Sequence, residues 1–568
     1  MLAETFADSE FDALSRSASL IACDFLPPLR PNAHLRVPTC PMVVFSALLS
    51  FLSSTKSQEH PLLQEATSRL SDEDELIFAE NGQQTSLQVQ EDGVRVSVYS
   101  SGWFARPDVE LVPYLNILSA GISLTPGGRS SVFDFAYLSA KEKNKLILRQ
   151  LSGDVTEAHG AALLKWVENI QGRAYEGIKP GRRLLVFVNP HGGQGQAKTL
   201  WQEKVEPILA AAGCAVDVQY TGPINSPTNA ATVAHNLDVL QYDALVPLSG
   251  DGIVSELLNG LATRPDARTA LQIPIAPIPA GSGNALAVNL LGPENVVDVG
   301  LATLNAIKGV PMSLDICSVS QGATRRYSFL SQAFALMAQL DMGTEWIRWV
   351  GGIRFILGYI WGALTRAQYQ VEITMKVVES EKRTMVDAYN ALQQAKRTRA
   401  RDPNLTPPPS DSSMPPLLYG STDAPLPLGT IHTTITAPLE PGWHTFRLPV
   451  QIFCAGKLPW LSRDSMILPL SGDDGLIDVV LVPPRGIYAS LTGMDGQEEG
   501  RFIQNSDVFY YKVEAYRCTP GEKSGYISID GESIPYEPFQ VENHPRLARI
   551  MSIDGLWKGL ERVELPRV

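Results

Sequence analysis

An aspartate between two glycines is the first residue of this sequence that indicates a functional site. Asp251 lies in the segment Ser249-Gly250-Asp251-Gly252, which follows an apolar run and leads into a stretch of helical spacing that carries Glu256. Open α/β sheets bind ligands beside the carboxyl ends of their strands, and flanking glycines leave room for a substrate next to a carboxylate. We therefore interpret Asp251 as part of a ligand-binding site, the alternative being an aspartate that only serves a turn.

Two further glycine-rich loops stand between an apolar run and a helical segment. The segment 189–196 reads NPHGGQGQ, and the segment 279–284 reads PAGSGN. Glycines let backbone amides approach phosphate closely, and the N-terminus of the following helix favours negative charge. The first loop lacks the GKS/T ending of a Walker A loop and the glycine spacing of a dinucleotide fingerprint. Each loop alone is compatible with a tight turn, but three of them at the strand ends of one sheet favour a phosphate-binding site.

The elements that must position these loops are strands and helices in alternation, the pattern of a parallel sheet covered on both faces. Apolar runs predict strands at Leu184 to Val188, Ala215 to Tyr220, Ala244 to Leu248 and Ile273 to Ile278. Helical spacing predicts helices over Ala197 to Ala212, Ser226 to Leu240 and Ile253 to Thr263. Ser226 followed by Pro227 is typical of an N-cap and a first helical position.

The flanking regions have a strand-like texture. Residues 1–170 are predicted to be a β-rich module that ends in a helix. Leu87 and Val89 alternate with polar residues, Asp92-Gly93 indicates a turn, and the alternation resumes at Val94, Val96 and Val98. Ala158 to Ile170 then has helical spacing. Strand-like alternation resumes from about Val371 and predicts an antiparallel lobe. Residues 379–428, which are basic, polar and then proline-rich, are predicted to be a disordered and regulatory insertion.

Composition limits the classes of function. The chain has 568 residues, enough for two or three domains, and its net charge of -13 argues against nucleic acid as a partner. Six cysteines without paired spacing, no CxxC or HExxH motif and no basic n-region at the N-terminus predict a cytosolic protein without structural zinc. Met42 to Leu52 is too short to span a membrane, and Trp346 to Leu364 carries two arginines, so we expect a buried or interfacial helix there.

The three motifs NPHGGQGQA, SGDGIVSELLNGL and PAGSGNALA resemble the diacylglycerol-kinase-type catalytic domain, and most closely the sphingosine kinase (sphingoid long-chain base kinase) family. The resemblance covers residues of about 180 to 555 and includes the stretch from Ile529 to Glu532 and the stretch from Pro538 to Val541. It implies an α/β nucleotide-binding lobe over residues 180–310 and a β-sandwich lipid-binding lobe over 311–568, with ATP between them. The fold class expected is thus α/β plus all-β, preceded by the β-rich module.

The resemblance also implies roles for individual residues. It makes Asp251 the base that accepts the proton of the substrate hydroxyl, with Ser249, Gly250 and Gly252 lining the substrate side. The implied nucleotide contacts, in order along the chain, are Asn189, Pro190, His191, Gly192, Gly193, Gly195, Thr221, Glu256, Gly281, Ser282, Gly283, Arg348, Arg354, Asp530, Gly531 and Glu532. The two arginines would neutralise phosphate charge. Magnesium is expected to arrive with ATP rather than on a metal site of its own.

Substrate choice rests on the segment Phe334 to Met342, whose apolar residues suit a lipid tail. Asp341 matches the family aspartate that pairs with the amine of a sphingoid base, and such a carboxylate favours a cationic head over a neutral one. Read structurally, Asp341 is a helix-end carboxylate. Two departures from the family pattern are Gln194 and Gln196, where lysine is common, and a third is Gln339, where aspartate is common.

Three other functions stay open at this point: a kinase of ceramide or diacylglycerol, a non-catalytic lipid-binding protein, and a soluble NAD kinase. Asp341 argues against the first, intact Asp251 and Asp-Gly-Glu at 530–532 against the second, and the apolar segment around Asp341 against the third. Because the substrate is a membrane amphiphile, we expect peripheral association of a cytoplasmic protein with internal or plasma membranes, through the N-terminal module and the Trp346 to Trp361 stretch. The oligomeric state is open, and a homodimer is one of the states considered.

Overall fold

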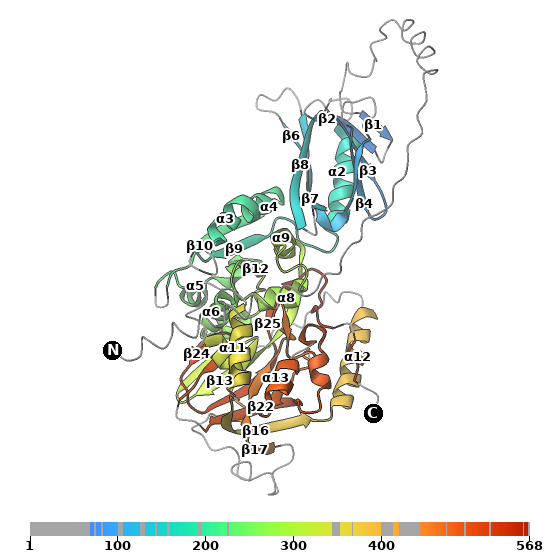
Figure 1. Cartoon of the computed structure of the whole chain (residues 1–568). Coiled ribbons are helices and arrows are strands. Elements are labelled where there is room, and N and C mark those ends of the chain that lie inside the picture. Colours follow the sequence, from blue (N-terminus) through green and yellow to red (C-terminus); the bar gives the residue numbers. More distant parts are fainter. Residues whose placement is uncertain are drawn as a thin grey trace, which may run out of the picture. The chain divides into compact units, whose positions relative to one another are not determined.

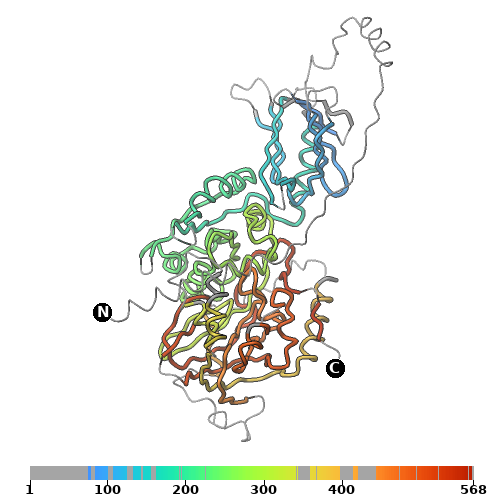
Figure 2. The backbone as a smooth tube through the Cα atoms, in the orientation of Figure 1, coloured from blue at the N-terminus to red at the C-terminus, as the bar shows by residue number. Residues whose placement is uncertain are grey.

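The computed structural model describes residues 69–565, apart from residues 73–74, 81–82, 100–105, 125–130, 143–144, 156–159, 191, 193–194, 224–225, 343–352, 366, 399–412, 420–442, 473, 494–495, 522–523 and 561. Figures 1 and 2 follow the chain in sequence colours from β1 to β25. The apolar segment Met42 to Leu52 and the first two cysteines lie outside the described residues. So do His191, Gly193 and Arg348.

The described part of the N-terminal module contains eight strands in two antiparallel sheets, the helix α2 and the short helix η1. Its elements are β1 (Arg69–Asp72), β2 (Glu75–Glu80), β3 (Gln83–Val89), β4 (Gly93–Tyr99), β5 (Asp108–Pro113), η1 (Tyr114–Asn116), β6 (Ile117–Leu124), β7 (Ser131–Glu142), β8 (Lys145–Val155) and α2 (Gly160–Ala174). Strands β1 to β5 form one sheet and β6 to β8 the other. The predicted hairpin is confirmed, because Leu87 pairs with Val96 and Val89 with Val94 across the Asp92-Gly93 turn.

The next lobe has the predicted parallel sheet, of strand order β10-β9-β11-β12. Its elements are β9 (Arg183–Val188), α3 (Ala197–Leu200), η3 (Trp201–Val205), α4 (Glu206–Ala211), β10 (Ala215–Tyr220), α5 (Ala230–Asn236), η4 (Val239–Gln241), β11 (Ala244–Ser249), α6 (Asp251–Ala262), α7 (Ala267–Ala270), β12 (Ile278–Pro279), α8 (Ala285–Leu291) and α9 (Val299–Lys308). Strands β9 and β11 are buried almost throughout, which explains their continuous apolar sequence.

Two boundaries in this lobe differ from the prediction. The fourth strand was predicted over Ile273 to Ile278 but is only Ile278–Pro279. Within the predicted range, Ile275 makes only isolated bridges, to Leu245 and to Ile550. The second helix begins at Ala230 and not after Ser226, because the side chain of Asn229 accepts a hydrogen bond from the amide of Ala231 and caps the helix there.

The C-terminal lobe is dominated by an eleven-stranded antiparallel sheet, of order β14-β13-β25-β22-β21-β18-β15-β23-β24, with β16 and β17 joined to it through β22. Its strands are β13 (Val310–Gln321), β14 (Thr324–Ser328), β15 (Ser331–Ala335), β16 (Tyr369–Glu379), β17 (Trp443–Val450), β18 (Ile452–Gly456), β21 (Ile477–Val482), β22 (Phe509–Pro520), β23 (Ile527–Ile529), β24 (Glu532–Ile534) and β25 (Phe539–Ser552). The remaining elements are α10 (Leu336–Met342), α11 (Ile353–Leu364), α12 (Lys382–Thr398), β19 (Trp460–Ser462), β20 (Ser465–Met466), α13 (Ile487–Thr492), η6 (Gln497–Glu499) and η7 (Arg501–Gln504). The antiparallel lobe expected from the alternating sequence is therefore present.

Part of the predicted disordered insertion is ordered. Residues 382–398 form α12, whose polar and basic composition misled the prediction. One face of this helix is apolar, and its residues Met385, Val386 and Tyr389 are buried in a core cluster with strands β18 and β21. The Tyr389 hydroxyl also donates to the Leu560 carbonyl (2.9 Å). The prediction is wrong for this helix because an amphipathic helix needs only a few apolar residues on its buried face. Beyond residue 398, the predicted insertion is described only at 413–419.

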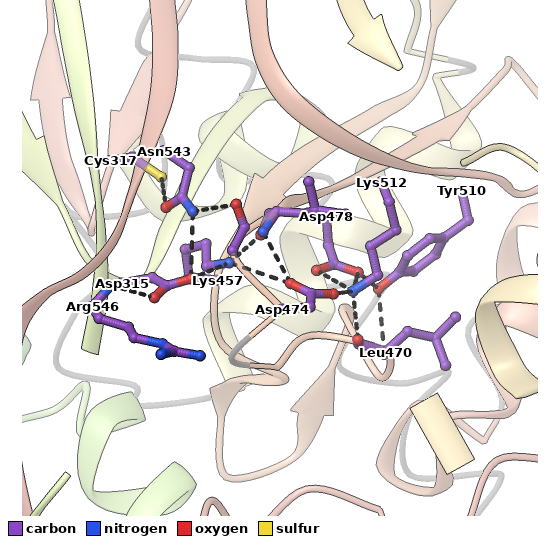
Figure 3. A network of polar contacts seen from close by, with 12 residues as sticks. Asp315, Cys317, Lys457, Leu470, Asp474, Asp478, Tyr510, Lys512, Asn543 and Arg546 are labelled. Atoms are coloured by element: carbon purple, nitrogen blue, oxygen red, sulfur yellow. Dashed lines mark hydrogen bonds and ion pairs between the residues drawn. The ribbon is translucent and has the colours of Figure 1, made fainter. Parts of the chain in front are cut away.

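Buried charges tie the C-terminal lobe together (Figure 3). The Lys457 ammonium lies 3.0 Å from Asp315 and 3.7 Å from Asp474, and the Lys512 ammonium lies 2.6 Å from Asp474 and 3.0 Å from Asp478. All of these side chains except Asp474 are less than a tenth exposed. The Tyr510 hydroxyl donates to Asp478 (2.5 Å), Lys512 also donates to the Leu470 carbonyl (2.7 Å), and the Arg546 amide donates to Asp315 (2.8 Å). We call Asp315, Lys457, Asp474, Asp478 and Lys512 the buried ion network.

The apolar stretch near Trp346 contains α11, over Ile353–Leu364. Across the described part of the chain, none of the helices combines the length and the apolar character that crossing a bilayer requires.

Candidate active site

The three glycine-rich loops meet at the carboxyl ends of β9, β11 and β12. The Asn189 side chain donates to the Ser249 hydroxyl (3.3 Å), and the Ala280 amide donates to the Ser249 carbonyl (3.1 Å). Gly250 packs directly on the third loop, because a Cβ atom there would lie 2.5 Å from the Gly283 carbonyl oxygen. Any larger residue at position 250 would push the loops apart, so this glycine is required for a close approach and not for flexibility.

The third loop is shaped by its own asparagine. The Asn284 side chain accepts from the Gly281 amide (3.0 Å) and donates to the Gly281 carbonyl (2.8 Å), which closes a tight turn. Ser282 and Gly283 are left exposed on the outside of this turn. The sequence motif contained Asn284, but no role was predicted for it.

The carboxylate of Asp251 links two helices. Asp251 is the first residue of α6, its amide donates to the Gly283 carbonyl (3.3 Å), and its two carboxylate oxygens accept from the first two amides of α8, Ala285 (2.7 Å) and Leu286 (3.0 Å). Burial raises the pKa of this carboxyl above its ordinary value of 3.8, and the backbone hydrogen bonds oppose that shift. Each oxygen uses one lone pair on α8, so each keeps one for a further donor.

Glu256, predicted to contact the nucleotide, is engaged in local structure. Its Oε2 atom accepts from Asn229 Nδ2 (2.8 Å) and from the Ala230 amide (3.2 Å), which ties α6 to the start of α5. Its pKa is raised, first by burial and also by the neighbouring charge of Glu532. These bonds explain why α5 begins at Ala230.

The C-terminal lobe reaches the same region through the Asp530-Gly531-Glu532 turn between β23 and β24. A Cβ atom at Gly252 would lie 3.4 Å from Glu532 Oε1, so this carboxylate is beside the start of α6. Asp530 and Gly531 have φ angles of 52° and 84°, in the left-handed region, and this conformation makes the turn tight. Acidic groups from both lobes therefore lie near the glycine-rich loops.

Asp530 itself is buried and serves the neighbouring backbone. Its Oδ1 atom accepts from the Ser328 hydroxyl (2.6 Å) and from the amides of Leu330 (3.0 Å) and Ser331 (2.9 Å), and its Oδ2 atom accepts from the Phe329 amide (2.9 Å). Burial raises its pKa to about 6 in spite of these donors. The described contacts of this side chain thus hold residues 328–331 in place.

Other predicted site residues are described only in part. Thr221 is buried directly after β10, where its amide donates to the Val188 carbonyl (3.0 Å). Asp341 lies in α10 and Arg354 in α11, and only their backbones are described. Helix α10 follows β15 directly, after Ala335 at a φ angle of 61°.

The carboxylates described at this site suit a magnesium ion that arrives together with a phosphorylated ligand. Within the described ranges no group of three or more histidines, cysteines, aspartates or glutamates is arranged to hold a metal ion. Two hard oxygen donors, Asp251 and Glu532, do flank Gly252, and magnesium is usually held by one or two carboxylates together with substrate phosphates. The arrangement can therefore take up a phosphorylated ligand that carries its own magnesium ion.

Comparison with known proteins agrees with this chemistry. Residues 183–319 match the family model described as "Diacylglycerol kinase catalytic domain". The chain is similar to "Sphingoid long chain base kinase 4" of Schizosaccharomyces pombe, with 35% identity over 67% of this chain and 77% of that protein. It is similar to "Sphingosine kinase 2" of Homo sapiens, with 34% identity over 65% of this chain and 71% of that protein.

A solved structure of a putative diacylglycerol kinase from Bacillus anthracis str. Sterne covers 66% of this chain and 96% of its own, at 19% identity and a TM-score of 0.44.

Proposed function

Because this chain belongs to the sphingoid long-chain base kinase family, we propose that it transfers the γ-phosphate of ATP to the primary hydroxyl of a sphingoid base, with Asp251 as the general base. The observation that carries the proposal is the placement of the Asp251 carboxylate, which both lobes approach and which the first two amides of α8 orient. Family membership supplies the reaction class, and this geometry supplies the residue.

Asp251 accepts the hydroxyl proton as the phosphoryl group is transferred. Its raised pKa supports this role, because a base of higher pKa binds the proton more strongly. The amides of Ala285 and Leu286 fix the carboxylate, so one lone pair on each oxygen points away from α8. Positioned proton transfer of this kind contributes about a hundred- to ten-thousand-fold to the rate.

The nucleotide phosphates bind the glycine-rich loops that surround Asp251. Support comes from the exposed positions of Ser282 and Gly283, and from the short distance between the first loop and Ser249. Backbone amides and helix N-termini favour phosphate there. Among the residues with described side chains, we assign to the nucleotide Asn189, Pro190, Gly192, Gly195, Thr221, Gly281, Ser282, Gly283 and Glu532. We also propose the nucleotide contacts implied for His191, Gly193, Arg348 and Arg354. Glu532 and Asp251 are the residues that would hold magnesium, which would neutralise phosphate charge when bound.

Glu256, Asp530 and Gly531 act on the nucleotide site indirectly in this proposal. The bonds of Glu256 to α5 and of Asp530 to residues 328–331 support a role in holding the walls of the site. Gly531 provides the tight turn that brings Glu532 to Gly252.

The lipid binds to the C-terminal lobe, which we infer to be the sandwich that the family resemblance implies. Support comes from one buried apolar cluster to which residues of β13, β15, β16, β18, β21, β22, β23, β24 and β25 all contribute, as the inner face of a sheet that closes on itself would. A second cluster, with α12, covers the opposite face of β18 and β21. Phe334 and Ala335 of the first cluster lead directly into α10, which carries Asp341, the residue that we assign to the amine of the substrate.

The protein meets the membrane that supplies this lipid through α11 and α13. Helix α11 exposes Ile360, Trp361 and Leu364, with Trp361 67% exposed, and α13 exposes Tyr488 at 81%. The two helices are joined by a hydrogen bond from the Tyr359 hydroxyl to the Ser490 carbonyl (2.6 Å). Exposed aromatic and aliphatic side chains on paired helices suit the interface of a bilayer. A cytoplasmic enzyme that visits internal or plasma membranes follows, and the four described cysteines, which are free thiols, are consistent with a reducing compartment.

The substrate class is tested by phosphate transfer from γ-labelled Mg-ATP to sphingosine, dihydrosphingosine, phytosphingosine, ceramide and diacylglycerol. We expect label in the three free bases only. Asp341→Asn should lower kcat/KM for the bases by roughly 10- to 100-fold, because an ionic hydrogen bond to the amine is lost. Equal labelling of ceramide or diacylglycerol, or an unchanged kcat/KM in Asp341→Asn, would refute the assignment of Asp341.

The membrane surface is tested by flotation with liposomes that contain the lipid substrate. Trp361→Ala combined with Leu364→Ala should release the protein, whereas Leu240→Ala, which removes an apolar side chain that is 86% exposed on the α/β lobe, should not. Equal flotation of both variants would show that α11 is not the contact surface.

A further inference from the structure

Two asparagines join the helices that hold Asp251 to the main chain of the C-terminal lobe. Asn259 lies two turns into α6, the helix that begins at Asp251, and Asn289 lies in α8, the helix whose first amides bind the Asp251 carboxylate. Each asparagine pairs with both polar groups of one residue in the other lobe. This repeated arrangement is independent of the predicted site residues.

The geometry of the two pairs is the same. Asn259 Nδ2 donates to the Tyr327 carbonyl (2.9 Å), and its Oδ1 atom accepts from the Tyr327 amide (3.0 Å). Asn289 Nδ2 donates to the Trp460 carbonyl (2.8 Å), and its Oδ1 atom accepts from the Trp460 amide (3.1 Å). A side-chain amide that binds both the N–H and the C=O of one residue fixes position and orientation together, as a neighbouring strand does.

The Asn259 pair closes a ring of contacts around the site. Tyr327 is followed by Ser328, and residues 328–331 are bound by the Asp530 carboxylate. Glu532, two residues after Asp530, lies beside Gly252 at the start of α6. The C-terminal lobe therefore lies beside helix α6 at both ends, through Glu532 next to Gly252 and through the hydrogen bonds of Asn259 near its last turn.

The Asn289 pair recruits a third segment. Asn289 is fully buried. The Trp460 indole donates to the Lys558 carbonyl (3.0 Å), and the Lys558 amide donates to the Asn289 carbonyl (2.7 Å). Helix α8, β19 and residues near the C-terminal end of the described chain thus meet at one asparagine. An apolar residue in place of Asn289 would leave the buried amide and carbonyl of Trp460 without this partner.

We propose that Asn259 and Asn289 are positioning residues of the phosphoryl-transfer reaction, which hold α6 and α8, and through them the carboxylate of Asp251, in register with the lobe that binds the lipid. The inference rests on the proposed role of Asp251 as base. Phosphoryl transfer depends on alignment more than on covalent chemistry, and a displacement of about 1 Å can lower a rate by about 100-fold. Neither asparagine needs to touch a substrate to act in this way.

Asn305 provides a matched control within the same chain. It is a buried asparagine on α9, and its Nδ2 atom donates to the Met551 carbonyl (2.9 Å), so it too joins the α/β lobe to β25. It makes one such bond and not two, and α9 makes no described bond to Asp251. A purely structural role predicts that all three asparagines behave alike, whereas positioning predicts that only two affect turnover.

The test compares Asn259→Ala, Asn289→Ala and Asn305→Ala in the full chain. Thermal melting is measured first, and kcat and KM for Mg-ATP and for sphingosine are then measured at a temperature at which each variant is folded. We expect kcat to fall by roughly 10- to 100-fold for the first two variants, with KM for Mg-ATP changed by less than about threefold. Asn305→Ala should lower the melting temperature and leave kcat within about threefold.

Unchanged kcat in Asn259→Ala and Asn289→Ala would overturn the proposal, and so would an equal fall in Asn305→Ala. If the fully buried Asn289 cannot be replaced without unfolding, Asn259→Ala, whose site is only half-buried, decides the matter. Asp251→Asn in the same assay separates the two claims: full activity in that variant would reject Asp251 as the base, whereas loss of activity there with unchanged kcat in Asn259→Ala would reject only the positioning residues.

Discussion

The α/β lobe and the C-terminal lobe place their charges in opposite parts of their sheets. In the α/β lobe, β9 and β11 are apolar and buried apart from the exposed Arg183 at the start of β9, and the candidate base Asp251 comes directly after β11 ends. In the C-terminal lobe the buried ion network lies within the core, with Lys457, Lys512 and Asp478 almost without exposure (Figure 3). Charge at a strand end is available to a ligand, whereas charge within a core is available only to the fold. We therefore expect removal of charge to lower activity in the first lobe and stability in the second.

The largest effect on stability is predicted for Lys512→Met. The change leaves Asp478 and Asp474 facing each other without their shared cation, and breaking a buried ion network on one side typically costs about 3–5 kcal/mol. Urea unfolding measures the loss. Arg562→Met, which breaks an exposed pair with Glu564, is the control and should change the free energy of unfolding by less than about 1 kcal/mol. Comparable losses in the two variants would show that burial does not set the importance of charge in this lobe.

Asp530→Asn tests a residue that belongs to both categories. The amide group of asparagine would face the Phe329 amide, so one of four hydrogen bonds to the carboxylate is replaced by a repulsion. We expect a loss of about 1–3 kcal/mol in stability together with lower turnover, because residues 328–331 and Glu532 depend on this side chain. Melting curves and phosphate transfer measured on the same preparation check both. A loss of stability without any change in turnover would place Asp530 with the buried ion network.

The pH dependence of kcat/KM sharpens the role of Asp251. A general base works only when it is ionised, and burial raises the pKa of this carboxyl above 3.8. Activity should therefore be present above the raised pKa and fall about tenfold for each pH unit below it. Initial rates measured across the acid range, with melting curves at each pH, give the midpoint. A decline that begins only at the ordinary pKa of an exposed aspartate would show that burial does not tune this residue.

Glu256→Gln should have the smallest effect. The side-chain oxygen of glutamine can still accept from Asn229 and Ala230, and the repulsion between Glu256 and Glu532 disappears. We expect stability to change by less than about 1 kcal/mol and to rise if it changes, since a carboxylate whose pKa is raised opposes folding at neutral pH. Chemical unfolding and KM for Mg-ATP are the measurements. A large increase in that KM would mean that the charge of Glu256 contacts the nucleotide, as the family resemblance implies.

The sequence predicted those features that depend on residues close together in the chain. Apolar runs predicted the parallel strands, the Asp92-Gly93 turn predicted the β3–β4 hairpin, and the glycines around Asp251 predicted the loop that the structure brings against Gly283. Errors arose where a distant residue decides the local structure. Glu256 of the next helix supports the Asn229 cap at the start of α5, and core contacts with β18 and β21 order α12 in spite of its polar composition.

Contacts between residues far apart in the chain carried no signal in the sequence. Asp315, Lys457 and Lys512 are separated by many residues and each looks like an ordinary surface charge until the sheet brings them together. Asn259 and Asn289 stood within or just after the quoted motifs, but their partners Tyr327 and Trp460 could not be identified from spacing. For Asn289 the available hint was a single polar residue in the otherwise apolar helix α8.

The most direct test of the account is the rate of phosphate transfer to sphingosine by Asp251→Asn in a single turnover with Mg-ATP in excess. Asparagine keeps the size of the side chain and cannot accept the proton, so the account predicts a rate lower by about 100- to 10,000-fold. Its amide group would face one of the two α8 amides that bind the carboxylate, so we also expect a loss of about 1–3 kcal/mol in stability, and the rate is measured at a temperature at which the variant is folded. A rate equal to that of the unmodified protein would contradict the assignment of Asp251 as the base.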